Sequence, residues 1–83
     1  MNKFAQHNLN KRIHAKANEF GLVGIEREVF VFIAQGGSEY GINSVRRKFS
    51  ERYIPAVQAL ASLMEKNLVF QMVSSCCYYT VAV

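Results

Sequence analysis

Hydrophobic residues recur at helical spacing through most of this chain and merge into an almost continuous apolar run near its end. Leu9, Ile13, Ala17 and Phe20 lie three or four residues apart, which places them on one face of a helix over residues 2–20. Gly21 follows, and glycine often ends helices because it adopts the left-handed backbone conformation without a steric penalty. The pattern predicts an amphipathic first helix that stops at Gly21.

The next segment predicts a helix over residues 26–35 that is apolar around most of its circumference and is therefore the central buried helix. Its apolar residues are Val29, Phe30, Phe32, Ile33 and Ala34. Glu26 and Glu28 come early in this helix, where the helix dipole favours negative charge. Gly36 and Gly37 end it. A shorter third helix is expected over residues 42–49, with inward side chains at Ile42, Val45 and Phe49.

A fourth helix is expected over about residues 54–66, since Pro55 suits the first turn of a helix and Asn67 suits a left-handed cap. We expect its core face to hold the larger apolar side chains, with two further small or apolar residues beside them: Val57, Leu60, Met64, Leu63 and Ala61. The remaining positions are expected to point outward: Ala56, Gln58, Ala59, Ser62 and Glu65.

Two strands should follow, over residues 68–73 and 76–83, because both segments are rich in β-branched and aromatic residues. Ser74 and Ser75 form the one turn-like break between them. The expected fold is mainly α with a small C-terminal β-hairpin. Residues 1–83 are expected to form a single domain, in which the helix at 1–20 is an addition to a core at 25–83.

Charge is distributed unevenly along the chain. The formal net charge is +4, with 51% hydrophobic and 19% charged residues, which indicates a globular domain. Basic residues outnumber acidic ones in 1–20 and 42–66, acidic ones prevail in 21–41, and 67–83 carry no charge. This pattern suits a polyanionic partner, although a solvated surface is the simpler explanation. No apolar stretch is long enough for a membrane span or signal peptide, so a cytoplasmic protein is expected.

Catalytic and metal-binding patterns are not found in the sequence. His7 and His14 are seven residues apart, about 10 Å along a helix, which is too far to chelate one ion unaided. Cys76 and Cys77 are adjacent, so on a strand they point to opposite faces, one into the core and the other outward as a free thiol. We therefore expect no enzyme activity, no cofactor and no metal site.

Three segments together resemble the winged helix-turn-helix domains of small bacterial, phage or plasmid regulators. They are Glu-Arg-Glu-Val-Phe-Val-Phe-Ile at 26–33, Gly-Ile-Asn-Ser-Val-Arg-Arg-Lys-Phe at 41–49, and Pro-x-Val-x-x-Leu-x-x-Leu-x-x-Lys-Asn-Leu-Val at 55–69. The resemblance covers residues 25–83 and implies that the helix at about 54–66 is a recognition helix for the DNA major groove.

The resemblance implies double-stranded DNA as the partner and transcriptional regulation as the role. Gln58 would bond an adenine edge, Ser62 would donate to or accept from a base, and Ala59 would contact a thymine methyl group. Tyr53 would donate its hydroxyl to a phosphate. The expected phosphate anchors are the basic residues around the turn: Arg46, Arg47, Lys48 and Arg52.

Two alternatives stay open at this stage. The hairpin carries no lysine or arginine, and Glu65 would repel phosphate, so a single copy offers few DNA contacts. A homodimer through the N-terminal helix would double them, unless that helix packs on its own domain. The other alternative is a protein-interaction module without DNA binding, in which the uncharged C-terminal strand or the N-terminal helix contacts a partner protein.

Overall fold

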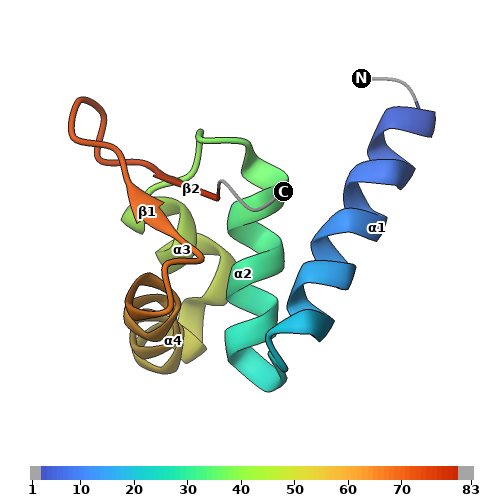
Figure 1. Ribbon diagram of the computed structural model, residues 1–83. Helices are drawn as coiled ribbons and strands as arrows, with labels where there is room; N and C mark the ends of the chain where they lie inside the picture. Colours follow the sequence, from blue (N-terminus) through green and yellow to red (C-terminus); the bar gives the residue numbers. More distant parts are fainter. Residues whose placement is uncertain (1–2, 81–83) are drawn as a thin grey trace.

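The computed structural model describes the backbone of residues 3–80 and the side chains from residue 8 onward. Within this part the chain is mainly helical and ends in a small antiparallel hairpin, which confirms that much of the expected fold (Figure 1). The elements in order are α1 Lys3–Glu19, α2 Gly24–Gly36, α3 Ile42–Phe49, the 3-10 turn η1 Ser50–Arg52, α4 Tyr53–Glu65, β1 Phe70–Gln71 and β2 Tyr78–Tyr79.

Helix α2 is the centre of the fold, as its apolar circumference predicts. It contacts α1 on one side, α4 on another and the hairpin strand β2 (Figure 1). Val29 and Phe30 are fully buried, and Ile33 is 1% exposed. Phe32 differs from the expectation, because its ring is only half-buried and lies beside α3 rather than inside the core.

Helices α1 and α4 end in the same way, with a left-handed residue followed by a buried leucine. Gly21 has φ 67° and Asn67 has φ 59°, which confirms both expected caps. The next residues, Leu22 and Leu68, donate their amides to carbonyls five residues earlier and turn their side chains into the core. This is the Schellman motif, in which the cap satisfies otherwise unpaired carbonyls at the helix end.

The end of α1 corrects one expectation. Ile13 and Ala17 are fully buried against the rest of the domain, but Phe20 is 45% exposed and does not extend the apolar stripe. The helix ends at Glu19, and the reversal at Gly21 brings Leu22 into the core position that Phe20 was expected to occupy. The cap, and not the helical spacing, decides which residue is buried there.

The orientation of α4 differs from the expectation in six positions. Val57, expected in the core, and Ser62, expected outside, are both half-buried. Ala56 and Ala59 were expected outside but are 0% and 6% exposed, whereas Met64 is 37% exposed and Ala61 is also exposed. The buried stripe passes through the alanines because small side chains let α4 approach its neighbouring helices closely. Leu60 and Leu63 are buried, as expected.

The hairpin is shorter than expected. Its register pairs Phe70 with Tyr79 and Gln71 with Tyr78, and the turn occupies residues 73–75. Cys76 then takes a left-handed conformation with φ 58°, so it lies in the loop and not on a strand. The loop therefore includes Cys76, which the strand propensity of the sequence assigns to the second strand. The remainder of that expected strand, 81–83, lies outside the described residues.

Strand β2 has backbone partners on both sides. Besides β1, it lies next to the segment before α3, where Gly41 bridges to Cys77 and the amide of Tyr78 donates to the carbonyl of Tyr40 at 2.7 Å. The open edge expected along the C-terminal strand is therefore not found at these residues. Separately, no helix within residues 3–80 combines the length and apolar character that a membrane crossing needs.

Candidate nucleic-acid interface

One face of α4 lies at the surface from end to end. It is formed by four exposed residues, Ile54, Gln58, Ala61 and Glu65. These positions follow one another at four-, three- and four-residue steps, so they form a single ridge on the helix. Ile54 is 67% exposed at the N-terminal end of the ridge, and the one charge on it, Glu65, is at the other end. The ridge is uncovered along about three turns of helix.

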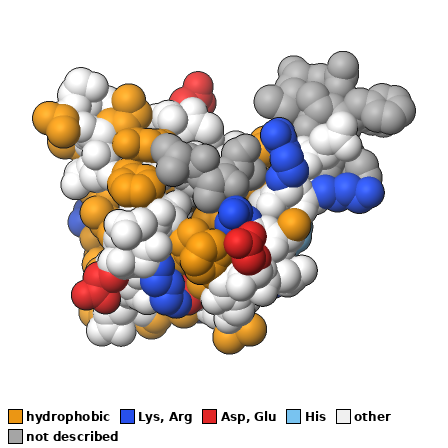
Figure 2. All heavy atoms as spheres, viewed as in Figure 1, with side chains coloured by type: hydrophobic (Ala, Val, Ile, Leu, Met, Phe, Trp, Pro, Cys, Tyr) orange, Lys and Arg blue, Asp and Glu red, His pale blue; other side chains and the backbone are white. Residues whose placement is uncertain are grey.

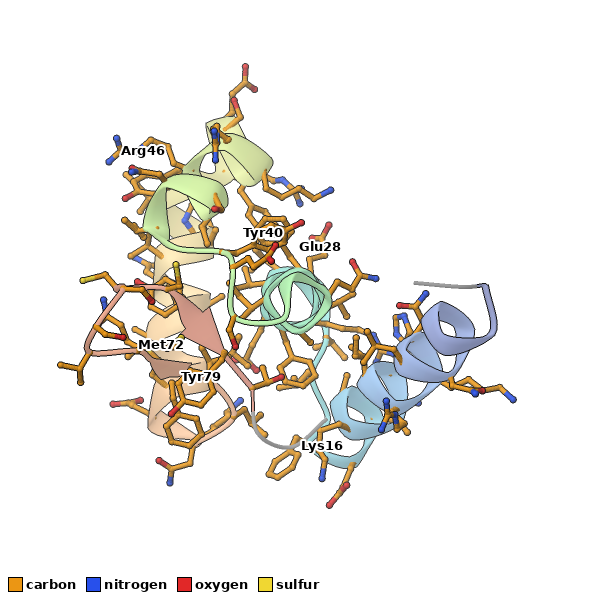
Figure 3. All side chains as sticks on the ribbon, turned by 90° about the horizontal axis from the view of Figure 1, so that it is seen from above. Lys16, Glu28, Tyr40, Arg46, Met72 and Tyr79 are labelled. Carbon is orange, nitrogen blue, oxygen red and sulfur yellow. The ribbon has the colours of Figure 1, made fainter. Side chains whose placement is uncertain are left out.

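Arg46 of α3 stands beside the N-terminal end of this ridge. Its guanidinium carbon is 5.1 Å from the centroid of the Tyr53 ring, and Tyr53 is the first residue of α4. Stacking on an aromatic face restrains a long side chain while leaving its donors free. Arg46 and Lys16 lie on opposite sides of the molecule (Figure 3), so these two cations of α3 and α1 belong to separate surfaces.

The three consecutive cations of α3 do not form one cluster. Successive residues are rotated by about 100° around a helix, so Arg46, Arg47 and Lys48 fan out. Arg47 and Lys48 line a hollow beside Phe32 and Tyr40, whereas Arg46 stacks on Tyr53. Among the described side chains, none of the three cations forms an ion pair. Only Arg46 is held directly against α4.

Arg52 is turned toward α2. Its guanidinium donates to Glu28 at 2.9 Å and lies 5.5 Å from the centroid of the Phe49 ring. Both charged side chains are about half exposed, so this ion pair contributes little to stability. It does offset the charge of Arg52, which makes this residue a weaker phosphate anchor than Arg46.

Ser62 is half-buried and faces α2 instead of the exposed ridge. Its side chain lies near the carboxylate of Glu26, and that carboxylate accepts from Lys66 at 2.7 Å. Partial burial acts to raise the pKa of Glu26, but the hydrogen bond from Lys66, the neighbouring Ser62 hydroxyl and the charge of Lys66 outweigh it. The net result is a pKa below the ordinary value of 4.5. Of the three expected base-contacting residues, only Gln58 is on the ridge, because Ala59 is 6% exposed and belongs to the core.

The ion pair between Glu26 and Lys66 predicts that part of the folding stability depends on pH. A carboxyl whose pKa is lower in the folded state stabilises the fold above its unfolded pKa, and the stabilisation is lost as the pH falls through the folded value. We therefore expect Glu26→Gln to destabilise the domain at pH 6 and to have a much smaller effect at pH 3. Urea unfolding at both pH values measures the loss of unfolding free energy. In a protein that already carries Lys66→Gln, the additional loss caused by Glu26→Gln at pH 6 should largely vanish. An equal effect at both pH values contradicts the assignment.

One residue of the hairpin, Tyr78, lies near Tyr53 at the start of α4. Tyr78 of β2 is 7% exposed, and its burial, together with the neighbouring Tyr53 and Cys76, raises the pKa of its hydroxyl. Side chains around the loop are apolar or uncharged, and Val73 at the turn is fully exposed. Hydrophobic side chains gather over this hairpin at the upper left of Figure 2, whereas Lys and Arg side chains stand out toward the upper right, where Figure 1 draws α1.

The histidines and cysteines do not come together. His14 is exposed and accepts a hydrogen bond from Arg27, and the side chain of His7 is outside the described part. Cys76 is exposed and Cys77 is half-buried, with its thiol 3.6 Å from the carbonyl of Glu39. Neither cysteine is in the core, which corrects that expectation, because the loop and not a strand carries Cys76. In the searched, described residues, no three His, Cys, Asp or Glu side chains are grouped to hold a metal.

Three members of the exposed ridge, Ile54, Ala61 and Glu65, are absent from the sequence-based set of site residues. Ile54 and Ala61 are missed because apolar residues on a helix are normally assigned to its core. The sequence does indicate which face of α4 is buried, since Ala56 and Ala59 fall on the same helical stripe as Leu60 and Leu63. No protein-family model, curated protein or solved structure matches this chain, so the functional argument depends on this geometry.

Proposed function

We propose that the chain is a winged helix that binds double-stranded DNA as a small regulator, with the exposed ridge of α4 in the major groove. The observation that carries the proposal is the bridge between Gly41 and Cys77. It ties the segment between α2 and α3 to the second strand of the hairpin. The order of a helix, a helix pair and a hairpin is the one that the sequence resemblance implies, and this bridge adds a contact between the hairpin and the segment before the helix pair.

The size and chemistry of the ridge support insertion into a groove. The major groove is about 12 Å wide and admits an α-helix of about 10–12 Å diameter. Gln58 lies in the middle of the ridge, where its amide can make two hydrogen bonds to an adenine edge. Ile54 and Ala61 flank it and offer apolar contacts for thymine methyl groups.

The cations of α3 support phosphate contacts at one end of the ridge. Arg46 is positioned by Tyr53, and Arg47 is exposed on the next position of the same helix. Neither is neutralised by a carboxylate among the described side chains, so both charges are available. Phosphate contacts of this kind set orientation and general affinity, while base contacts set sequence preference.

Fluorescence anisotropy with a labelled random duplex of about 30 base pairs tests the proposal. Binding should weaken steeply between about 50 and 200 mM salt, since each phosphate contact releases counterions. No binding at the lower salt concentration would reject DNA as the partner. A single-stranded oligonucleotide of the same length is not expected to compete well with the labelled duplex, because it has no major groove.

Gln58→Ala should change sequence preference more than general affinity. Loss of one bidentate base contact costs about 1–3 kcal/mol of discrimination at a single base position. We expect selection from a random duplex pool to give a wild-type consensus with adenine at that position and a variant consensus without it. The salt dependence of binding should stay the same. Identical consensus sequences for the two proteins would remove Gln58 from the interface.

A protein partner is the second candidate, and the exposed apolar residues favour it. Ile54 is 67% exposed and Val73 is fully exposed. Exposed apolar side chains are typical of surfaces that bind another protein, whereas surfaces that contact only water and phosphate are usually polar. In this case Ile54→Ser should abolish partner binding, and DNA should not bind at low salt. The partner is not expected to add to β2 at Cys77 and Tyr78, since both sides of that strand are occupied.

A homodimer remains a prediction that follows from the small number of DNA contacts in one copy. The apolar stripe of α1 does not itself call for a second copy, because Ile13 and Ala17 are buried against this chain's own core. Sedimentation velocity with and without duplex tests it. Two copies bound to one duplex would support dimeric binding, and one copy would contradict it.

A further inference from the structure

A groove crosses the outer side of α2 between α1 and α3. Its volume is about 320 Å³, within the range of small-molecule sites. Three apolar side chains, Val31, Phe32 and Phe49, line it together with two cationic residues, Arg27 from α2 and Lys48 from α3. It is separate from the exposed ridge of α4, and none of its lining residues lies on that helix.

Two neighbouring rings fix the orientation of Phe32. Its ring stacks on Tyr40 with 4.4 Å between centroids and 13° between planes, and it meets Phe49 edge-on at 5.9 Å and 89°. Gly36 makes this stack feasible, because a Cβ atom there would overlap the Tyr40 ring. An aromatic wall that is already ordered loses little entropy when a ligand packs on it.

Arg27 is a half-buried cation whose hydrogen bonds go to uncharged acceptors. It donates to the side-chain oxygen of Asn18 at 2.8 Å, to Nδ1 of His14 at 3.0 Å and to the carbonyl of Leu22 at 3.4 Å. These contacts hold the guanidinium in place and tie α1 to α2 without neutralising its charge. No carboxylate among the described side chains pairs with it.

The groove has one acidic residue in its lining, and that residue is already paired. Glu28 accepts from Arg52 at 2.9 Å, outside the groove. Lys48 is exposed and makes no ion pair within the described side chains. The groove therefore combines an ordered aromatic wall with two cations, Arg27 and Lys48, that lack a counter-charge.

We propose that this groove binds a small organic monoanion with an aromatic body, the ring packed on Phe32 and the anionic group between Arg27 and Lys48. Charge complementarity favours an anion over a neutral or cationic ligand of the same shape. The groove's volume suits one ring with a short acidic arm. The proposal does not depend on DNA binding by α4.

Three probes that share a phenyl ring test it: phenylacetate, 2-phenylethanol and 2-phenylethylammonium, each titrated into the ¹⁵N-labelled full chain. Phenylacetate should shift the amide signals of Val31, Phe32 and Lys48 with half-saturation at about 1 mM, an affinity that a fragment of this size reaches. The alcohol should bind at least about fivefold more weakly and the cation not at all. Equal binding of the three, shifts elsewhere or no shifts below about 20 mM would overturn the proposal.

A matched pair of variants separates the site from general charge attraction. Lys48→Gln should weaken phenylacetate binding at least about fivefold, to the level of the alcohol, because it removes an exposed cation of the groove. Lys11→Gln removes an exposed cation of α1 that does not line the groove and should leave binding unchanged. Both positions are exposed, so both variants are expected to fold. Equal losses in the two variants would contradict a defined site.

Discussion

Replacing both Arg46 and Arg47 with alanine is expected to lower duplex affinity about 60-fold at 0.1 M salt. Each phosphate contact contributes about 0.9 to the slope of log K against log salt concentration. When the salt is lowered tenfold, from the 1 M reference to 0.1 M, two contacts therefore raise log K by about 1.8. The loss should be similar for every duplex sequence, because phosphates carry no sequence information. Anisotropy titrations at several salt concentrations measure both the affinity and the slope.

The control for this prediction is a double variant with the same change of net charge. Lys11→Ala with Arg12→Ala removes two exposed cations from α1, the helix that packs on α2. It should keep the wild-type slope and lose little affinity. If both double variants lose affinity equally, binding depends on net charge alone and the position of Arg46 beside Tyr53 is irrelevant.

Phe30→Ala is expected to have the largest effect on stability. Phe30 is fully buried in the central helix, and truncation of such a side chain costs about 3–5 kcal/mol. A domain of this size shifts its Tm by about 4–8 °C for each kcal/mol, so the Tm should fall by at least about 12 °C. Thermal unfolding followed by circular dichroism measures the shift.

Phe20→Ala is the matched control, because it makes the same substitution at a ring that is 45% exposed. Its effect should stay within about 0.5 kcal/mol, as is usual for surface positions. The comparison distinguishes the two phenylalanines that hydrophobic spacing alone treats alike. A larger effect at Phe20 than at Phe30 would mean that the core is not centred on α2.

The helices were predictable because their signals are local. Apolar spacing and the caps at Gly21 and Asn67 specify where α1 and α4 end, and α3 has the predicted bounds, Ile42–Phe49. The burial of α4 was harder to predict, since Ala56 and Ala59 carry little hydrophobic signal. Their role depends on how closely the helix packs against its neighbours, and that is a property of the assembled fold.

The candidate site was predictable in composition but not in arrangement. The sequence identifies Arg46, Tyr53 and Gln58, and these lie on or beside the exposed ridge. It does not show that Ser62 turns toward Glu26 or that Arg52 pairs with Glu28, because these partners are more than 20 residues apart in the chain. The bridge from Gly41 to Cys77 is non-local in the same way.

Amide chemical-shift mapping of the ¹⁵N-labelled chain with a duplex of about 15 base pairs tests the central claim most directly. If α4 enters the major groove, the largest shifts should fall on Gln58 and Ala61 of the exposed ridge and on Arg46 beside it, while α1 from Asn8 onward changes little. Shifts confined to α1, or none at low salt, would contradict DNA binding by α4.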